Sequence, residues 1–259
     1  METIPVCGFP VAAVSFRRAV KLADGLLTVP GALPHMIFTP NLKTASLVHG
    51  DPLLRRALCA SSLNLPDGVG VGLLAFAGGH PVPERIPGVD FGMALSALCE
   101  KRRLRLYLLG GMPGVAEKAA ETLRARFPRL IVCGTHDGYF KKSGPETASV
   151  IADIKKARAD VLFVCFGVPM QEKWLYRNRG RLSSLRLCIG LGGSLDIYAG
   201  EKRRAPKAMR TLGLEWLYRI TREPERLPGF FRDACRLPAL LWQTMKESDG
   251  SPDRRSFEK

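Results

Sequence analysis

The chain has 259 residues, and its 39 Lys and Arg outnumber its 24 Asp and Glu to give a net charge of +15. Hydrophobic residues make up 46% of the chain, which is ordinary for a globular protein and excludes disorder throughout. Seven single cysteines without a CxxC pair argue against a disulfide framework or a zinc site and favour reduced, mostly buried thiols in the cytoplasm. We find no signal peptide and no apolar run near the ~20 residues that cross a bilayer, so we expect a soluble or peripheral protein.

The excess of positive charge indicates an anionic partner, for which nucleic acid, acidic lipid headgroups and a phosphorylated substrate all qualify. Residues 202–236 hold ten basic and four acidic side chains, a net charge of +6. The positive charge is therefore concentrated late in the chain.

Short apolar runs recur along the chain, with helical patterns between them. The runs lie at 35–41, 63–68, 104–111, 130–138, 159–167 and 185–193. Apolar runs of this length that alternate with helices indicate βα units on a parallel sheet, and the first ~30 residues are expected to form a small lead-in element. We therefore predict an α/β fold with a Rossmann-like parallel sheet and flanking helices over residues 1–198, and a helical C-terminal appendage over residues 199–259.

Polar or glycine-rich motifs follow the apolar runs directly. They are Thr-Pro-Asn at 39–41, Pro-Asp-Gly at 66–68, Gly-Gly at 110–111, His-Asp-Gly at 136–138, and the segments 167–172 and 192–196. In open parallel sheets, ligands bind outside the carboxyl ends of the strands, where these motifs would meet. Each motif alone is typical of a turn, but Thr39, Gln171 and Glu172 are residues that a turn does not need. The set as a whole favours a ligand cleft.

Asp67 lies in the stretch LNLPDGVGVG at 63–72, for which two interpretations compete. Asp67 is either a turn residue before a dinucleotide-binding glycine loop or a reactive carboxylate at the floor of a cleft. Residues 70–75 fit the pattern G-x-G-x-x-A, but the next apolar run ends without the carboxylate that would hold a ribose. Close packing of a helix explains Gly70 and Gly72 better than a dinucleotide does.

Several well-known catalytic motifs are missing from the sequence. It contains no Walker loop, no GxSxG elbow and no Asp-x-Asp pair, which is the simplest means to hold a divalent metal on a nucleotide diphosphate. Arginine can neutralise a diphosphate instead, through bidentate hydrogen bonds. Arg85 is a candidate for this role, and a surface charge beside Glu84 is an equally good interpretation of it.

The segment after residue 198 combines basic and apolar side chains. Leu212, Trp216 and Leu217 mix with Arg219 and Arg222 in an amphipathic pattern. This pattern suits a helix that lies on an anionic membrane. A helix packed on the core with a solvated basic face is the alternative, and both can hold at once. We find no recognisable nucleic-acid-binding module, and a basic lipid- or nucleic-acid-binding module without catalysis is the competing class of function.

Longer motifs span most of the chain, from about residue 35 to residue 226. They are TPN at 39–41, LPDGVGV at 65–71, ERIPGVDF at 84–91, LLGGMPGVAEKAA at 108–120, HDGYF at 136–140, DVLFVCFGVPMQEKW at 160–174 and the segment that begins GGSLDIYAGEKRR at 192–226. In order and spacing this set resembles the WecG/TagA/CpsF family of bacterial glycosyltransferases. The resemblance implies an inverting enzyme that moves a sugar from a UDP-sugar onto a polyprenyl-diphosphate-linked sugar in cell-surface polysaccharide biosynthesis. It also implies a metal-independent reaction without a cofactor, since the UDP-sugar is a substrate.

The resemblance further implies roles for individual residues. Asp67 matches the family's proposed general base, and Thr39 lines the same pocket as a second catalytic residue. The residues implied in substrate binding are Asn41, Arg85, Gln171, Asp196, Arg219 and Arg226. Of these, Arg219 and Arg226 match arginines that close over the diphosphate.

The identity of the donor stays open between UDP-N-acetylmannosamine and UDP-glucose. The expected partners are the UDP-sugar, the polyprenyl-diphosphate-linked acceptor and an anionic membrane surface, with no nucleic acid, and a homo-oligomer is left open. The expected location is cytoplasmic, peripheral on the inner face of the cell membrane.

Overall fold

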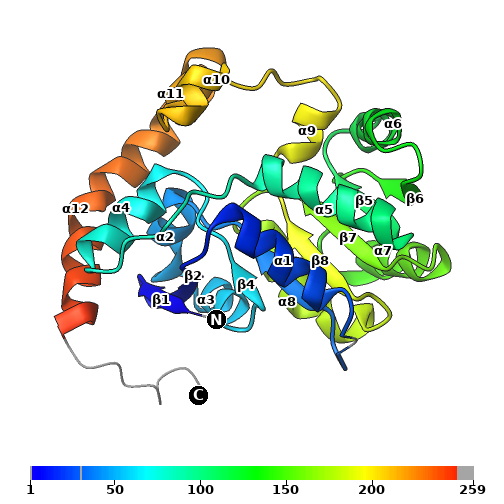
Figure 1. The fold of residues 1–259 in the computed structure, drawn as a ribbon, viewed down its shortest axis with the longest axis horizontal. Helices are drawn as coiled ribbons and strands as arrows, with labels where there is room; N and C mark the ends of the chain where they lie inside the picture. Colours follow the sequence, from blue (N-terminus) through cyan, green and yellow to red (C-terminus); the bar gives the residue numbers. More distant parts are fainter. Residues whose placement is uncertain (1, 30, 250–259) are drawn as a thin grey trace.

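The structure is a computed structural model that describes residues 2–29 and 31–249 of the chain. A six-stranded parallel sheet runs through these residues with strand order β4-β3-β8-β7-β5-β6, and an antiparallel hairpin, β1-β2, packs beside it (Figure 1). Helices cover both faces of the sheet. The predicted α/β fold with a Rossmann-like parallel sheet is therefore confirmed.

Each apolar run that predicted a strand contains one strand of the central sheet. The strands are β1 (Thr3–Val6), β2 (Phe9–Ala12), β3 (His35–Phe38), β4 (Leu63–Asn64), β5 (Arg105–Gly110), β6 (Ile131–His136), β7 (Val161–Cys165) and β8 (Leu187–Gly190). The helices are α1 (Phe16–Leu26), α2 (Leu42–Val48), α3 (Pro52–Cys59), α4 (Val69–Ala77), α5 (Gly88–Arg102), α6 (Val115–Arg126), α7 (Gly144–Lys156), α8 (Met170–Asn178), α9 (Ser194–Tyr198), α10 (Lys207–Thr211), α11 (Glu215–Arg222) and α12 (Leu227–Asp249). Short 3-10 turns are η1 (Arg179–Leu182) and η2 (Pro224–Arg226).

Alternate residues of each strand point to opposite faces of the sheet, as the pleat requires. Leu106 and Leu108 of β5 enter one hydrophobic core, and Tyr107 and Leu109 enter the other. Helices α1, α5, α6 and α9 cover the first face, and α2, α3, α4, α7, α8 and α12 cover the second. Because both faces are covered, the strands read as continuous apolar runs in the sequence.

The cysteines contribute to these cores as reduced thiols. In the described part of the chain none of them forms a disulfide, and the buried ones are Cys7, Cys99, Cys165 and Cys188. Cys235, on α12, is exposed. The prediction of mostly buried thiols is therefore confirmed.

The order of the strands brings distant segments of the chain together. β8 lies between β3 and β7, and all three strands run parallel, so the residues after them share one edge of the sheet. The segments that begin at Thr39, Phe166 and Leu191 are therefore neighbours. This edge is where an open parallel sheet binds its ligands.

The segment after α9 leaves the sheet, and its last helix packs on the helices and the hairpin beside the sheet. α10 and α11 lie at one end of the molecule, and the long helix α12 runs back along α2, α4 and β1 (Figure 1). Leu240 of α12 is buried in the second core, and Ser46 donates from Oγ to Asp233 Oδ1 at 2.7 Å. The division at residue 198 stays a prediction, and residues 250–259 lie outside the described part of the chain. None of the described helices combines the length and the apolar character that crossing a bilayer requires.

Candidate active site

Asp67 follows β4 in a loop that backbone hydrogen bonds hold on both sides. Its N–H donates to the carbonyl of Pro40 at 2.9 Å, and the N–H of Ile86 donates to the carbonyl of Pro66 at 2.8 Å. Gly68 then takes a φ of +84°, which L side chains rarely adopt, and begins α4 as its N-cap. The abrupt turn fixes Asp67 at the carboxyl edge of the sheet.

Gly70, in the first turn of α4, serves the packing of this helix. A Cβ at Gly70 would lie 2.7 Å from the Cβ of Leu42, so α4 approaches α2 this closely only with glycine there. Gly72 is less restricted, because its added Cβ would meet Val82 at 3.6 Å, an ordinary contact. The contact at Gly70 agrees with close helix packing, whereas the space around Gly72 does not require a glycine there.

The half-buried carboxyl of Asp67 lies among charged side chains from other segments. Burial raises the pKa of Asp67 to about 6, and the positive charge of Arg219 acts against this rise. Glu215 adds to the rise, while Arg85 and Arg204 oppose it. At neutral pH Asp67 is therefore mostly ionised, yet it binds a proton more tightly than an ordinary Asp. A general base that works near pH 7 needs this combination.

Ion pairs fix the segment 199–222 close to this loop. Arg204 donates from Nη2 to Asp90 Oδ2 at 2.6 Å, and Arg219 donates from Nη2 to Glu215 Oε1 at 2.9 Å. The Nε of Arg204 lies 3.9 Å from the same Glu215 oxygen. Although burial acts to raise the pKa of Asp90, the hydrogen bonds and charge of Arg204 hold it below its usual value. The two carboxylates thus keep the arginines in place next to Asp67.

Arg85 comes from the loop between α4 and α5. Its guanidinium donates to the backbone carbonyl of Arg210. Glu84 instead accepts a hydrogen bond from the N–H of Phe16 at 2.7 Å. Because Glu84 has this other partner, Arg85 is not a surface charge paired with its neighbour, and its role in the site stays a prediction.

Sequence reasoning does not find Asp90, Arg204 or Glu215. Arg204 belongs to a basic cluster that predicts only net charge, and 114 positions separate it from Asp90. No local spacing therefore relates the two residues. The signal that could have found them is their place inside the quoted motifs at 84–91 and 192–226.

Thr39 and Asn41 follow β3 and bond to the protein itself. Thr39 is 5% exposed and donates from Oγ1 to the carbonyl of Gly190 at 3.2 Å, so it ties the end of β3 to the end of β8. Asn41 accepts at Oδ1 from the N–H of Thr44 at 3.2 Å, and Thr44 Oγ1 accepts from the N–H of Asn41 at 3.1 Å. This capping box begins α2. Both predicted residues support the loops around Asp67.

Gln171 and Glu172, in the first turn of α8, are each 1% exposed. Gln171 accepts at Oε1 from the N–H of Gly192 and donates from Nε2 to Glu172 Oε1, each at 2.9 Å. Burial raises the pKa of Glu172 to about 7, and the hydrogen bond from Gln171 acts against the rise. Both polar atoms of the Gln171 amide therefore have protein partners, and the side chain holds the loop after β8 in place.

A cavity of about 550 Å³ lies at the carboxyl ends of β5, β6 and β7. Its lining is aromatic, thioether and charged, and consists of Gly111, Met112, Gly138, Tyr139, Phe140, Lys142, Cys165, Phe166, Met170 and Asp196. The Nζ of Lys142 lies 3.7 Å from the ring centre of Phe140 and 4.3 Å from that of Phe166. We call this space the β5–β7 cavity. Asp196, in α9, is the sequence-predicted residue that lines it.

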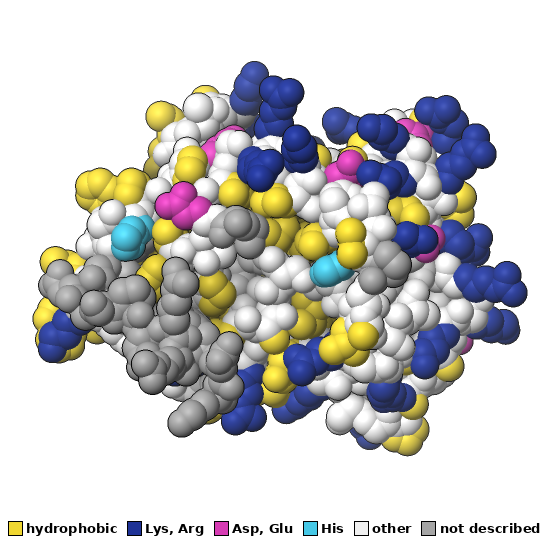
Figure 2. Space-filling model, turned by 60° about the horizontal axis from the view of Figure 1, so that its bottom comes forward, with side chains coloured by type: hydrophobic (Ala, Val, Ile, Leu, Met, Phe, Trp, Pro, Cys, Tyr) yellow, Lys and Arg dark blue, Asp and Glu magenta, His cyan; other side chains and the backbone are white. Residues whose placement is uncertain are grey.

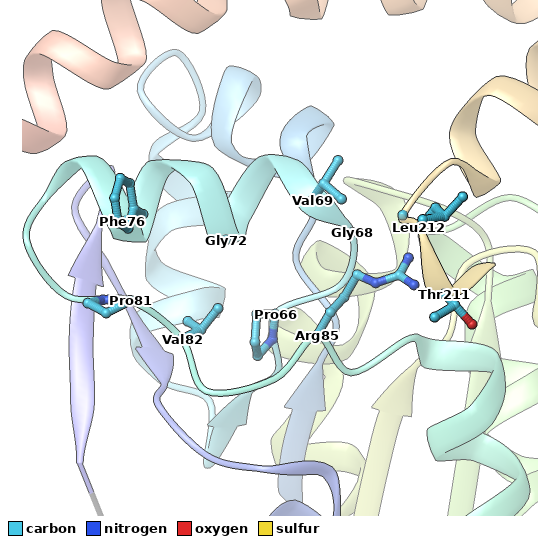
Figure 3. Close-up of a pocket in the computed structure, with 11 residues that line it drawn as sticks. Pro66, Gly68, Val69, Gly72, Phe76, Pro81, Val82, Arg85, Thr211 and Leu212 are labelled. Atoms are coloured by element: carbon cyan, nitrogen blue, oxygen red, sulfur yellow. The ribbon is translucent and has the colours of Figure 1, made fainter. Parts of the chain in front are cut away.

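A smaller cavity of about 380 Å³ lies between α4 and the loop that follows α4 (Figure 3). It is lined by Pro66, Gly68, Val69, Gly72, Phe76, Pro81, Val82, Arg85, Thr211, Leu212 and Gly213. Figure 3 shows Arg85 near Leu212 and Thr211 at one end, and Phe76 near Pro81 at the other. We call this space the α4 groove. Its charged end is the end nearest Asp67.

The sequence-predicted site residues with charged side chains lie in two places. Asp67, Arg85 and Arg219 interact through their charges, whereas Asp196 stands at the β5–β7 cavity. The side chain of Arg226, which ends η2, lies outside the described residues. Among residues 2–29 and 31–249, no three His, Cys, Asp or Glu side chains are grouped so that they could hold a metal ion.

Basic side chains dominate the molecular surface. On the face drawn in Figure 2, Lys and Arg far outnumber Asp and Glu and gather along the upper and right-hand edges of the view. The excess of Lys and Arg agrees with the net charge of +15. It favours an anionic ligand or surface.

Comparison with known proteins identifies the family of the chain. The model of the glycosyl transferase WecG/TagA/CpsF family matches residues 4–253 of the chain, nearly its whole length. The chain belongs to this family. It is therefore a glycosyltransferase, and the resemblance that the sequence motifs indicate is confirmed.

Relatives of the chain share one name, N-acetylglucosaminyldiphosphoundecaprenol N-acetyl-beta-D-mannosaminyltransferase. The protein of Bacillus subtilis (strain 168) is 33% identical over 190 residues, which are 73% of this chain and 71% of the relative. That of Bacillus spizizenii is 30% identical over 83% of this chain and 80% of its own length. That of Staphylococcus aureus (strain MW2) is 32% identical over 64% of each chain.

Proposed function

We propose that the protein transfers a sugar, with inversion, from a UDP-sugar to a sugar carried on a polyprenyl diphosphate, with Asp67 as the general base. The observation that carries the proposal is a carboxyl with a pKa of about 6, held at the sheet edge by its own backbone and facing the charge of three arginines. The relatives are named as mannosaminyltransferases of N-acetylglucosaminyldiphosphoundecaprenol, which supports this class of acceptor.

Inversion requires a single displacement at the anomeric carbon of the donor. The acceptor hydroxyl oxygen forms the new glycosidic bond while the bond between the anomeric carbon and the UDP oxygen breaks. Asp67 takes the hydroxyl proton, and UDP leaves with the electron pair of the broken bond. Because the pKa of Asp67 is about 6, its carboxylate is ionised at pH 7 and ready to accept this proton.

The arginines near Asp67 supply positive charge where the reaction carries negative charge. The side chain of Arg219 is 41% exposed and can reach a ligand while it is paired with Glu215. Arg219 can bind the leaving diphosphate bidentately, and Arg85 offers a second guanidinium to the diphosphate of the acceptor. Arg204 is already paired with Asp90, so we assign it to holding the segment in place. Charge that is placed in advance stabilises a leaving diphosphate, and we expect transfer to proceed in this way without a metal.

We place the donor nucleotide in the β5–β7 cavity. Its volume of about 550 Å³ falls within the usual range of ligand pockets. Tyr139, which is 68% exposed, offers a ring for stacking on a base, and Asp196 offers a carboxylate to sugar hydroxyls. The hydrogen bond between Gln171 and Gly192 fixes the loop that separates this cavity from Asp67. The relatives' names favour UDP-N-acetylmannosamine over UDP-glucose as the donor.

We further propose that the enzyme works peripherally on the inner face of the cell membrane, where a polyprenyl-linked acceptor is embedded. Trp216 and Phe231 are 37% and 60% exposed, and Trp216 stacks on Phe230 with ring centres 4.7 Å apart. These rings lie in the segment 202–236, which has a net charge of +6. Aromatic and basic side chains together favour adsorption to an anionic lipid surface.

A UDP-release assay tests the proposed function. The donors are UDP-N-acetylmannosamine and UDP-glucose, and the acceptor is N-acetylglucosaminyl diphosphate on a short prenyl chain. We expect UDP release that depends on both donor and acceptor and is faster with the first donor. Binding to anionic vesicles without UDP release from any pair would instead support the competing function, a basic lipid-binding module without catalysis.

A further inference from the structure

Helix α4, which begins directly after Asp67 and Gly68, contains no polar side chain and yet is partly exposed. Val69 and Phe76 are 48% and 67% exposed. Together with Gly72 they lie at spacings of three and four residues, so they share one face of the helix. A surface helix normally turns polar side chains to solvent, so an exposed apolar face of this kind indicates a binding surface.

This face of α4 forms one wall of the α4 groove. Pro81 and Val82 form the opposite wall, and Leu212 from the appendage stands at one end (Figure 3). Gly72 keeps the middle of the groove open, since it has no side chain and an added Cβ would stand 3.6 Å from Val82. The volume of about 380 Å³ holds a thin flexible chain. It is too small for a helix of another protein, which is about 10 Å across.

The character of the groove changes along its length. Arg85 stands at the end nearest Asp67, whose carboxyl its charge influences directly. Phe76 and Pro81 form the other end, which is apolar. A fitting ligand therefore has an anionic head at Arg85 and an apolar chain that extends toward Phe76. An isoprenoid diphosphate has its groups in this order.

We propose that the α4 groove binds the first isoprene units of the acceptor's polyprenyl chain, with the diphosphate at Arg85. The identity of the ligand rests on the proposed function. Insertion of α4 into the bilayer would need an exposed apolar face but no groove beside it. The concave space between α4 and Val82 favours one bound chain over contact with the membrane surface as a whole. The enzyme then selects its acceptor by the lipid as well as by the sugar.

Filling the groove tests this subsite. Gly72→Leu places a side chain in its middle and favours the helix, since leucine has the higher helix propensity. Gly72→Ala adds only a methyl group, for which there is room. The matched control is Gly25→Leu, in α1, where an added Cβ meets nothing within 4 Å. Calorimetric titration measures the affinities for farnesyl diphosphate and for methyl diphosphate. Steady-state kinetics measures KM for two sugar acceptors, one with a farnesyl diphosphate and one with a methyl diphosphate.

We expect the wild type to bind farnesyl diphosphate at least about tenfold more tightly than methyl diphosphate. Gly72→Leu should lose this preference, Gly72→Ala should reduce it, and Gly25→Leu should keep it. In kinetics, Gly72→Leu should raise KM for the farnesyl-linked acceptor by about tenfold and leave KM for the methyl-linked acceptor and the donor unchanged.

Different failures point to different conclusions. Equal affinity of the wild type for the two diphosphates, or an unchanged preference in Gly72→Leu, would overturn the subsite even if sugar transfer proceeds normally. Two other results would also overturn the subsite if Gly72→Leu keeps its chain preference. Loss of binding to phosphatidylglycerol vesicles by this variant would assign the α4 face to the membrane. A change in its oligomeric state would assign the face to contact with a second copy of the chain. If the chain preference disappears in Gly72→Leu, the result would support the groove. If the wild type also transfers sugar from no UDP-sugar, the proposed function would be overturned while the groove stands.

Discussion

The pH dependence of sugar transfer should report the pKa of Asp67. With a pKa of about 6, only about a tenth of the molecules carry an ionised Asp67 at pH 5. An Asp with the ordinary pKa of 3.8 would be more than about nine-tenths ionised there. If Asp67 is the general base, kcat/KM should therefore fall by about tenfold between pH 7.5 and pH 5.

We call this fall of kcat/KM toward low pH the acid limb. Two substitutions should shift the pH of the acid limb in opposite directions. Glu215→Gln removes a carboxylate that raises the pKa of Asp67 and releases Arg219 from its 2.9 Å pair, so the limb should shift to lower pH. Arg219→Gln removes the strongest of the opposing positive charges, so the limb should shift to higher pH. The control Arg102→Gln breaks a surface ion pair with Asp24 and should leave the limb in place.

The assay is acceptor-dependent UDP release, measured as kcat/KM from about pH 4.5 to pH 8.5. A limb near pH 4 in the wild type would show that the site does not raise the pKa of the base. Shifts of Glu215→Gln and Arg219→Gln in the same direction would show that these charges do not act on the titrating group. Either result would refute the assignment of the limb to Asp67.

The same pKa predicts a change in stability. A carboxyl with a native pKa above its unfolded value binds more protons in the native state, so the free energy of unfolding falls as pH rises from 3.8 to about 6. At about 1.4 kcal/mol per pKa unit, ionising Asp67 costs the native state on the order of 3 kcal/mol at neutral pH. Asp67→Asn should be more stable than the wild type by up to this amount at about pH 8 and equally stable below about pH 4 in denaturant unfolding. Equal stability at the higher pH would mean that Asp67 ionises without cost.

Three further predictions concern the metal and the membrane. Transfer should persist in EDTA, because arginines near Asp67 can carry the diphosphate charge; loss of activity that Mn²⁺ or Mg²⁺ restores would contradict this. Phe231→Ser should weaken sedimentation with anionic vesicles severalfold, since Phe231 is 60% exposed, whereas the control Val29→Ser should not. Arg219→Ala should lower turnover more than it weakens vesicle binding, because several basic residues share the contact with the membrane. A larger loss of vesicle binding than of turnover would assign Arg219 to the membrane alone.

The sequence predicts the central sheet well because its strands are buried on both faces. The apolar run 159–167, for example, contains β7, and its residues alternate between the two cores. The hairpin β1-β2 is different, because its strands are four residues each and contain prolines at Pro5 and Pro10. Such short strands carry no clear alternation. Strand order also depends on contacts between distant segments, which no local pattern records.

The candidate site is predictable in residue type but not in partners. The Pro-Asp-Gly motif predicts Asp67 at a strand end because the turn chemistry is local. By contrast, the sequence shows that Gln171 is polar and near the cleft, but not that Gly192 and Glu172 occupy its amide. Asn41 is an exception, since Asn is a preferred N-cap residue and its place before the helical pattern is a local signal.

The role of Asp67 is tested most directly by the rate of UDP release from Asp67→Asn, with UDP-N-acetylmannosamine and a prenyl-diphosphate-linked N-acetylglucosamine. The amide keeps the shape of the side chain but cannot accept the acceptor's proton. We expect kcat to fall by ~10²–10⁴-fold, while the exposed-site control Asp153→Asn, on α7, stays at the wild-type rate. Turnover by Asp67→Asn close to that of the wild type would contradict the general-base role and leave Asp67 as a turn residue.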